Sequence, residues 1–473
     1  FDYFNNLGYS LLKMEEYEEA ITYLNKALEI EQDALSVFTN LSEVYLGLRD
    51  FNKASEYIDK SIKKIINKEY YVINQHVSVF WHKATINTAL QKDSETVEMF
   101  KSILNKEFNE NIFYLLASVD PNAISKQIAD KAIEKSKKNH NNFKNKLERF
   151  YFVTPLYFGL ALYFRKSNKL KSEEYYHLGN QETFNSTRYN SYDYQNKIQF
   201  SIDHYEENVK NFEIKDNNMG ENNFFIVGSP RSGTTLVESI ATSNNEVFAG
   251  GELLTAKNLI SSYLQNKDKD TKKIMSDFNN KYIRRTDFMR GKSKYIIDKL
   301  PENFLYLGYI LKFLPKVKVI RLFRDPWDTA ISLYKQRYVQ NIPFSSSFFN
   351  IGVFMANFEA VNLYWNKSIE NKDERILDLF YEEIVQDDTT AQKKIYKFLE
   401  IHASYSKDER DKFFSPTASI RQVQGGIHQK SVKKEEFVDQ KEEFYQAFEM
   451  QRKYWKIKGL VPEGSSFFGY KIQ

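Results

Sequence analysis

The segment from Phe224 to Leu236 constrains the fold of this chain more than any other stretch. Its apolar start, Phe224–Val227, predicts a β-strand, the Gly-Ser-Pro-Arg-Ser-Gly run that follows predicts a tight turn, and two threonines can begin a helix. Backbone N–H groups of such a turn and of the helix N-terminus converge on a phosphate, and arginine and hydroxyl side chains add donors. The predicted phosphate-binding residues are Ser229, Pro230, Arg231, Ser232, Gly233, Thr234 and Thr235.

The same loop departs in one position from the phosphate loop of nucleoside triphosphatases. Gly228 and Gly233 have the spacing of the two Walker A glycines, but Thr234 stands where those enzymes have lysine. We therefore expect a loop that holds a nucleotide phosphate without hydrolysing a nucleoside triphosphate. A P-loop kinase or nucleoside triphosphatase remains an alternative interpretation, because it shares the strand, the loop and the helix.

The N-terminal part of the chain repeats itself with a period of 34 residues, which is the length of a tetratricopeptide unit. Leu7 and Ala20, for example, recur as Leu41 and Ala54. Small residues let paired helices approach closely, and large apolar residues fill the seam between them. The pattern predicts an α-solenoid of stacked helix pairs, whose extended surface could bind a peptide, a polymer or a partner protein, or mediate self-association.

A polar, glycine-containing stretch, Asp216–Asn223, separates the repeats from a region with a different pattern. After it, apolar strand-like runs alternate with helical stretches, which is typical of a parallel sheet covered by helices. These runs are Phe224–Val227, Tyr295–Ile297 and Val317–Phe323. The sequence predicts a helical solenoid domain at 1–215, followed by a P-loop-like α/β domain at 222–473.

A second candidate phosphate site follows the run that ends at Phe323. Asp325 suits a helix cap and Pro326 suits the first helical position, so a helix is expected to start there. Arg324 directly precedes the cap, and Ser332 lies further along the same helix. Alone, an Arg-Asp-Pro turn is an ordinary cap, but next to the glycine-rich loop it predicts that Arg324 and Ser332 bracket a second phosphate.

Composition excludes several other classes of function. Lys and Arg number 67 against 63 Asp and Glu, and the formal charge of +4 gives no general attraction to nucleic acid. The chain has no cysteine, and its seven histidines show no paired-ligand spacing, so no metal site is predicted. The apolar run Phe150–Phe164 is shorter than the roughly twenty residues of a membrane span and predicts a buried helix.

Two motifs together carry a family resemblance. Pro230–Leu236, PRSGTTL, resembles the 5′-phosphosulfate loop of sulfotransferases that use 3′-phosphoadenosine-5′-phosphosulfate (PAPS), and Arg324–Ser332, RDPWDTAIS, resembles their 3′-phosphate motif. The catalytic region is similar to that of tyrosylprotein sulfotransferases, and its fusion to repeats resembles bacterial repeat-containing sulfotransferases. The resemblance implies PAPS as co-substrate, 3′,5′-adenosine bisphosphate (PAP) as product, no required metal, and a bacterial cytoplasmic location.

The resemblance also implies roles for residues outside the two loops. Glu252 corresponds to the general base, Lys299 to the lysine that steadies the bridging oxygen, and Ser419 to a serine beside the sulfonate. Tyr381 corresponds to a tyrosine that contacts the nucleotide, and Lys434 to a basic residue that closes over it. These roles fit a reaction that needs a base for the acceptor proton and cations on the transferring group.

The identity of the acceptor stays open at this stage. No histidine lies between Arg231 and Arg324, which favours the carboxylate of Glu252 over the histidine base of cytosolic small-molecule sulfotransferases. Leu253 follows Glu252, where tyrosylprotein enzymes place an arginine that reads acidic peptides, and Glu435 replaces an aromatic residue of the family. A peptide, a glycan or a small hydroxyl compound all fit as acceptor. A repeat scaffold with an inactive sulfotransferase module is the second alternative.

Overall fold

The computed structural model describes residues 1–66, 76–138, 145–187, 189–212, 218–265, 270–338, 342–369, 373–411, 413, 432 and 435–467. The chain forms two compact units, Phe1–Tyr189 with Tyr334–Ser347, and Asn190–Leu333 with Phe348–Gln473. The predicted boundaries 1–215 and 222–473 stay a prediction. The compact units differ from them in two places, because Ser191–Asn208 belongs to the second unit and Tyr334–Ser347 to the first.

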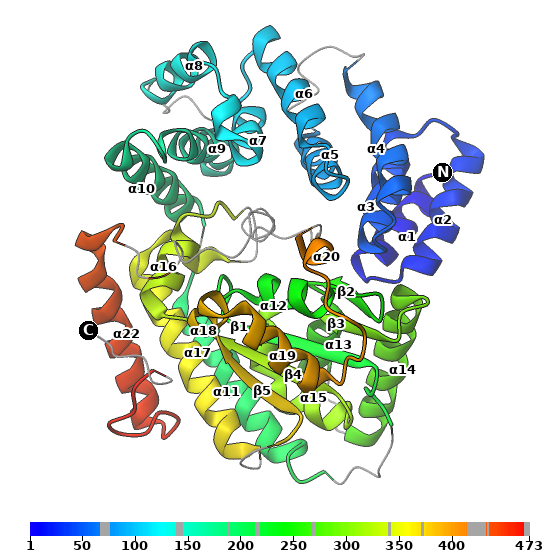
Figure 1. The fold of residues 1–473 in the computed structure, drawn as a ribbon, viewed down its shortest axis with the longest axis vertical. Helices are drawn as coiled ribbons and strands as arrows, with labels where there is room; N and C mark the ends of the chain where they lie inside the picture. Colours follow the sequence, from blue (N-terminus) through cyan, green and yellow to red (C-terminus); the bar gives the residue numbers. More distant parts are fainter. Residues whose placement is uncertain are drawn as a thin grey trace. The chain divides into compact units, whose positions relative to one another are not determined.

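The first unit is built from helices that pack as consecutive pairs (Figure 1). A β-carbon at Gly8 would lie 2.6 Å from the Leu24 side chain of the next helix, so glycine allows this pair to approach closely. Its helices are α1 (Asp2–Lys13), α2 (Tyr17–Ile30), α3 (Leu35–Gly47), α4 (Phe51–Ile66), α5 (Val77–Ala89), α6 (Asp93–Lys106), α7 (Glu110–Val119), α8 (Lys126–Ser136), α9 (Lys146–Phe164) and α10 (Lys169–Ser186), with the short turns η2 (Pro121–Ala123) and η5 (Pro343–Ser346).

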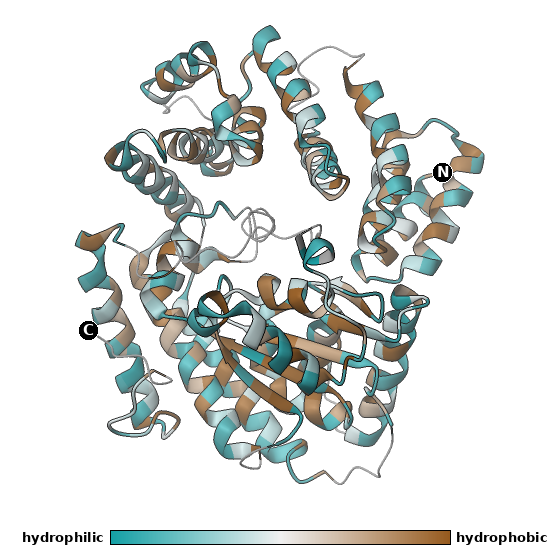
Figure 2. Ribbon diagram, in the orientation of Figure 1, coloured by the Kyte–Doolittle hydropathy of each residue, from teal (hydrophilic) through white to brown (hydrophobic). Residues whose placement is uncertain are grey.

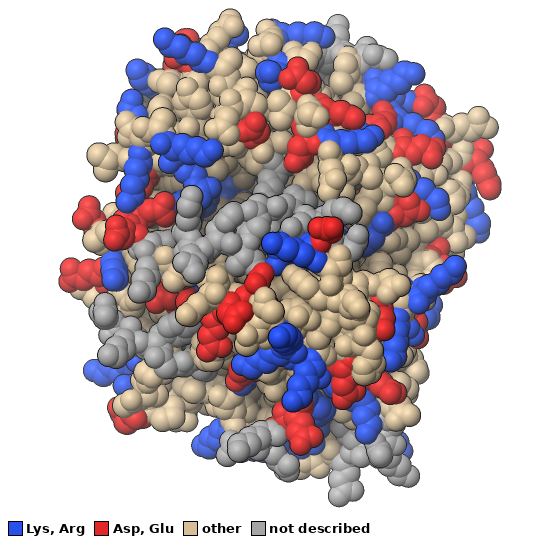
Figure 3. Space-filling model, in the orientation of Figure 1, with Lys and Arg blue, Asp and Glu red and all other residues tan. Residues whose placement is uncertain are grey.

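The apolar run Phe150–Phe164 lies within α9 and is largely buried, which confirms the buried helix that the sequence predicts. Over the parts of the chain that the structure describes, no helix is long and apolar enough to cross a membrane. The described side chains of both charge signs lie interspersed on the face shown in Figure 3, as the near-equal numbers of acidic and basic residues suggest.

The second unit contains a five-stranded sheet in which every neighbouring pair is parallel. Its strands are β1 (Asn223–Gly228), β2 (Val247–Gly251), β3 (Tyr295–Asp298), β4 (Lys318–Phe323) and β5 (Ile376–Phe380). They lie in the order β2-β3-β1-β4-β5. The central strand β1 therefore has β3 and β2 on one side, and β4 and β5, which come later in the chain, on the other. Because all five strands are parallel, their carboxyl ends share one edge, which confirms the predicted parallel α/β sheet.

Helices surround this sheet and make up the rest of the second unit (Figure 1). They are α11 (Ser191–Asn208), α12 (Thr234–Ala241), α13 (Thr255–Gln265), α14 (Thr271–Arg290), η4 (Pro301–Tyr306), α15 (Leu307–Phe313), α16 (Pro326–Tyr334), α17 (Phe348–Ser368), α18 (Tyr381–Gln386), α19 (Asp388–Leu399), α20 (Lys407–Asp411), η7 (Val438–Gln440) and α22 (Lys441–Ile457). Residues 326–333 of α16 belong to the second unit, and its last residue, Tyr334, belongs to the first.

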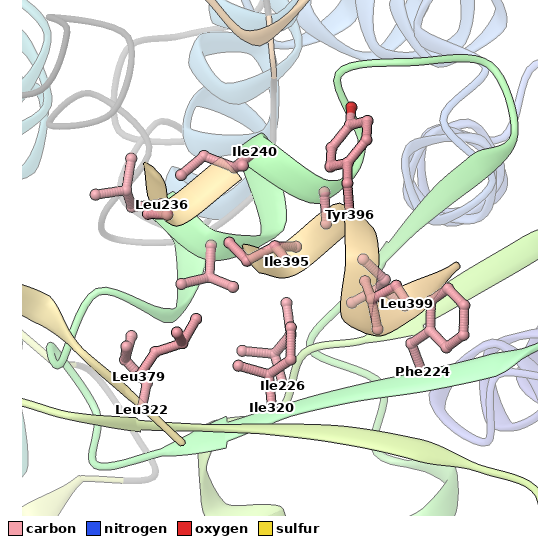
Figure 4. Packing of buried hydrophobic residues seen from close by; sticks show 14 of the residues in the cluster. Phe224, Ile226, Leu236, Ile240, Ile320, Leu322, Leu379, Ile395, Tyr396 and Leu399 are labelled. Atoms are coloured by element: carbon pink, nitrogen blue, oxygen red, sulfur yellow. The ribbon is translucent and has the colours of Figure 1, made fainter. Parts of the chain in front are cut away.

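Apolar side chains hold α12 and α19 on one face of the sheet. Leu236 of α12 and Ile395 of α19 belong to the same buried cluster as Ile226 of β1 and Ile320 of β4 (Figure 4). Successive strand residues point to opposite faces, so Phe225 stacks instead on the ring of Tyr282 in α14, at a centroid distance of 5.6 Å. Strand β1 is accordingly apolar and buried along its length (Figure 2), and this packing fixes the start of α12 at the carboxyl edge of the sheet.

Candidate active site

Each strand of the sheet is followed by a residue or loop that the sequence predicts to be functional. Glu252 follows β2, Lys299 follows β3, the loop Ser229–Gly233 follows β1, Arg324 follows β4, and Tyr381 follows β5. Read across the sheet, they stand in that order along one edge. Neighbouring strands lie about 4.8 Å apart, so the row extends over roughly 20 Å. Ligands of open α/β sheets bind at this edge, near the strand where the order reverses.

The loop after β1 has the backbone conformation of a close-fitting turn. Gly233 adopts a φ of 104°, and a β-carbon there would lie 2.4 Å from the ring of Tyr381. Arg231 also has a positive φ, 69°, and the Ser232 hydroxyl donates to the Ser229 carbonyl at 2.7 Å. Among the described residues no side chain caps the N-terminus of α12, and the N–H of Leu236 donates to the carbonyl of Gly233 at 2.9 Å.

The loop and the Arg-Asp-Pro turn are in direct contact. Nη1 of Arg324 donates to the carbonyl of Arg231 at 2.8 Å, and its guanidinium lies 4.3 Å from the centre of the Tyr381 ring. Arg324 is buried, as is Arg231. We refer to Arg231, Gly233, Arg324 and Tyr381 as the Arg324 cluster. The structure thus brings together residues from the ends of β1, β4 and β5, although their binding of phosphates remains a prediction.

The start of α16 confirms the predicted cap. Asp325 precedes the helix, which begins at Pro326, and its Oδ1 accepts from the N–H of Asp328 at 2.8 Å. The N–H of Asp325 donates to Oε1 of Glu382 at 3.0 Å. Burial raises the pKa of Asp325, the hydrogen bond from Asp328 opposes this rise, and the charges of Asp328 and Glu382 add to it. Ser332 lies buried on α16, about two turns beyond Arg324.

A second group of charged residues lies at the ends of β2 and β3. Nζ of Lys299 lies 2.8 Å from Oε1 of Glu252 and 4.0 Å from Oε2 of Glu238. The side chains of Lys299 and Glu238 are fully buried, whereas that of Glu252 is 46% exposed. We refer to Glu238, Glu252 and Lys299 as the Lys299 cluster. A buried cation between one buried and one accessible carboxylate is an arrangement suited to moving a proton and stabilising developing negative charge.

Sequence analysis missed Glu238. This carboxylate lies on α12, and its Oε1 accepts from the N–H of Gly251 at 3.0 Å. The signal that was available is a lone acidic residue within the otherwise apolar and hydroxyl-bearing stretch Leu236–Ala241. Two predicted residues, Ser419 and Lys434, lie outside the described residues, so the structure neither places them in the site nor removes them from it.

Comparison with known families identifies the two parts of the chain. Residues 223–405 match the sulfotransferase family, and residues 1–33 and 35–63 each match the tetratricopeptide repeat. The chain thus has tetratricopeptide repeats at its N-terminus and a sulfotransferase domain at residues 223–405, as the sequence motifs predict.

Two relatives share part of the sequence. A stretch of 232 residues is 29% identical to an uncharacterized protein of Aquifex aeolicus (strain VF5) and covers 44% of this chain and 30% of that protein. A stretch of 198 residues is 23% identical to a putative protein-tyrosine sulfotransferase of Caenorhabditis briggsae and covers 38% of this chain and 66% of that protein. The matches thus span less than two thirds of the length of either relative.

Solved structures that are similar to the chain include two sulfotransferases. One is the sulfotransferase domain of the Synechococcus PCC 7002 olefin synthase, with 16% identity, 51% of this chain and 98% of that chain covered, and a TM-score of 0.34. The other is a sulfotransferase of Mycobacterium avium, with 11% identity, 72% and 97% covered, and a TM-score of 0.31.

Proposed function

We propose that this protein transfers a sulfuryl group from PAPS to an acceptor hydroxyl, with Glu252 as the general base. The observation that carries the proposal is the 2.8 Å contact between Glu252 and the buried Lys299, at the same sheet edge as the phosphate loop. The base and the cation that the reaction needs are thus adjacent. The match of residues 223–405 to the sulfotransferase family supports the class of reaction.

The residues at the carboxyl edge fit the two phosphate ends of PAPS. The backbone N–H groups of Ser229–Thr235 would hold the 5′-phosphosulfate, since Gly233 has the left-handed conformation and no side chain in the described part caps α12. Arg324 and Ser332 would hold the 3′-phosphate. The hydrogen bond from Arg324 to the loop carbonyl and its contact with the Tyr381 ring orient the guanidinium, so less entropy is lost when a phosphate binds.

PAPS, when bound, would supply an activated sulfur atom. The acceptor oxygen forms a bond to this sulfur while the bond between the sulfur and the 5′-phosphate oxygen breaks. The electron pair of the broken bond leaves on that phosphate oxygen. Glu252 accepts the proton of the acceptor hydroxyl, and its 46% exposed side chain is accessible to an acceptor from solvent. Lys299 donates to the phosphate oxygen that gains charge. By resemblance, Ser419 would lie beside the sulfonate and Lys434 would close over the nucleotide.

The acceptor is proposed only as a class, a hydroxyl compound that reaches Glu252. The named activity of the Caenorhabditis briggsae relative makes tyrosine peptides one class to test, although Leu253 follows Glu252 here. The tetratricopeptide repeats are proposed to bind a protein, or a second copy of the chain, rather than nucleic acid. A bacterial cytoplasmic location remains an inference from the family resemblance.

A screen with labelled PAPS tests the proposed function. Phenols, tyrosine peptides, glycans and lipids are offered in turn, with EDTA present, to the wild-type chain and to Glu252→Gln. We expect label transfer to at least one class, and its loss in Glu252→Gln while PAP binding is retained. Unchanged turnover in Glu252→Gln would reject the base. Nucleotide binding without transfer to any acceptor would favour a scaffold with an inactive module.

A further inference from the structure

Glu238 is a fully buried carboxylate in an apolar environment, and the proposed mechanism gives it no role. Its side chain has no exposed area, and its neighbours Val237, Ile240 and Ala241 belong to the sheet-covering core. Placing a carboxylate in such surroundings is unfavourable unless it is paired and hydrogen-bonded. The partners of Glu238 therefore indicate why a charge is present at this position.

One oxygen of Glu238 holds the backbone that carries the base. Oε1 accepts from the N–H of Gly251, the residue directly before Glu252, at 3.0 Å. Pairing between β2 and β3 is irregular from Ala249 to Gly251, so this N–H is directed to Glu238 rather than along a regular ladder. The carbonyl of Gly251 accepts from the N–H of Lys299 at 2.8 Å. Gly251 is thus fixed from both sides, and the direction in which Glu252 leaves the strand is fixed with it.

The other oxygen of Glu238 makes no hydrogen bond to a described residue, and the buried cation of Lys299 lies at ion-pair distance from it. Nζ of Lys299 lies 4.0 Å from Oε2 of Glu238 and 2.8 Å from Oε1 of Glu252. When Glu252 takes a proton from an acceptor, its carboxyl group becomes neutral and no longer balances Lys299. A fully buried charge without a partner of opposite charge is unfavourable. Oε2 of Glu238, 4.0 Å from Nζ of Lys299, is then the carboxylate oxygen that still balances the lysine.

We propose that Glu238 is a positioning residue, the permanent counter-ion that balances Lys299 and holds it in place after Glu252 is protonated, and the anchor that orients Glu252 through Gly251. This inference rests on the proposed sulfuryl transfer. Glu238 makes no bond to the transferring group, and the acceptor proton stays on the carboxyl oxygen of Glu252. Because Glu238 lies one helical turn after Thr234, the helix that begins at the phosphate loop also positions the base.

Two substitutions separate the two parts of this role. The amide oxygen of Glu238→Gln still accepts from Gly251 N–H but carries no charge, whereas Glu238→Ala removes both the acceptor and the charge. The matched control is Glu359→Gln on α17, which makes the same change to another fully buried carboxylate, one paired with Arg452 at 2.6 Å. Turnover is measured with labelled PAPS and the first acceptor that the screen identifies, and PAP binding is measured by calorimetry.

We expect Glu238→Gln to lower kcat at least about tenfold, with the acceptor KM and the PAP dissociation constant each within about threefold of wild type. Glu359→Gln should keep kcat within about twofold. Wild-type kcat in Glu238→Gln would overturn the counter-ion role. A parallel loss of kcat and PAP affinity, or an equal loss in Glu359→Gln, would also overturn it, because a general loss of structure would then explain the effect.

Amide hydrogen exchange tests the anchor without any turnover. We expect the amide of Gly251 to exchange at least about tenfold faster in Glu238→Ala than in wild type, and at close to the wild-type rate in Glu238→Gln. Unchanged exchange in Glu238→Ala would reject the anchor. If the wild-type chain transfers no label to any acceptor, the proposed function fails, but this exchange measurement still decides whether Glu238 fixes Gly251.

Discussion

The Lys299 cluster and the Arg324 cluster stand on the same sheet edge but are built in different ways. In the Lys299 cluster, side chains of opposite charge from α12 and from the residues that follow β2 and β3 form ion pairs, and a fully buried lysine lies between two carboxylates. In the Arg324 cluster, a guanidinium contacts a backbone carbonyl and an aromatic ring, and a glycine in the left-handed conformation lies against that ring.

This difference suggests a division of labour along the edge. Backbone groups and a fixed guanidinium are suited to recognising phosphates, which keep their charge throughout the reaction. A cluster whose charges balance one another is suited to a step in which a proton moves. Substitutions in the Lys299 cluster are therefore expected to change kcat, and substitutions in the Arg324 cluster are expected to change nucleotide affinity.

The largest effect is expected for Glu252→Gln in the Lys299 cluster. Loss of a general base lowers kcat by about 10²–10⁴, and PAP affinity should stay near the wild-type value, because the phosphates are held elsewhere. Steady-state turnover with labelled PAPS, together with PAP calorimetry, checks both parts. The control is Glu302→Gln, which should retain turnover. Glu302 is a carboxylate near the same edge that pairs with Lys257. Weaker PAP binding in Glu252→Gln would break the division between the clusters.

Arg324→Ala should produce the opposite pattern. Hydrogen bonds to charged groups contribute about 1.5–3 kcal/mol, so the PAP dissociation constant should rise about ten- to hundredfold, measured by calorimetry at fixed salt. Arg321→Lys is the control on β4, the strand that precedes Arg324, since Arg321 pairs with Asp378 at 2.7 Å instead of contacting the loop. An unchanged dissociation constant in Arg324→Ala would remove Arg324 from the phosphate site.

Gly233→Ala should have a smaller effect, confined to the same cluster. The new β-carbon would meet the Tyr381 ring at 2.4 Å, and the φ of 104° is unfavourable for alanine. The expected loss is about 1–3 kcal/mol, seen as a lower unfolding midpoint and several-fold weaker PAP binding. Gly291→Ala, at another glycine of positive φ but with no atom within 4 Å of the new β-carbon, is the control and should bind PAP as wild type does. Full PAP affinity in Gly233→Ala would show that the loop conformation does not matter for binding.

The smallest effect is expected for Asp325→Asn, and it depends on pH. Burial in the folded protein raises the pKa of Asp325, so ionisation of this carboxyl group destabilises the folded state. The contribution of neutral Asp325 to the free energy of unfolding is therefore lost as the pH rises through its folded pKa. Asparagine can still accept from the N–H of Asp328 but has no charge. The urea midpoint of Asp325→Asn should therefore rise relative to that of wild type as the pH increases above about 3.9, the ordinary pKa of aspartate. A constant difference above this pH would contradict the raised pKa.

Local motifs made the Arg324 cluster more predictable than the Lys299 cluster. The glycine-rich loop and the cap at Asp325 are contiguous in sequence, and a strand, a turn and a helix start follow from them directly. The Lys299 cluster forms only because β2 and β3 are neighbours on one side of β1. No short segment of the sequence predicts the order of the strands. Glu252 and Lys299 came from the family resemblance, and Glu238 was missed because its partners are distant in sequence.

The sequence patterns also did not predict where the second unit begins. Helix α11 precedes the predicted linker, yet Tyr205 on it packs edge-on against Trp365 of α17, with ring centroids 5.0 Å apart. No local pattern identifies a helix that packs against residues so far along the chain. Ser419 and Lys434 remain predictions from the resemblance.

The binding of PAP in the presence of EDTA tests the central claim, that this edge holds PAPS, most directly. Calorimetry on the wild-type chain should give saturable binding at one site without magnesium, retained in Glu252→Gln and weakened about ten- to hundredfold in Arg324→Ala. Absence of PAP binding, together with magnesium-dependent binding of ATP, would contradict the account and assign the loop to a nucleoside triphosphate.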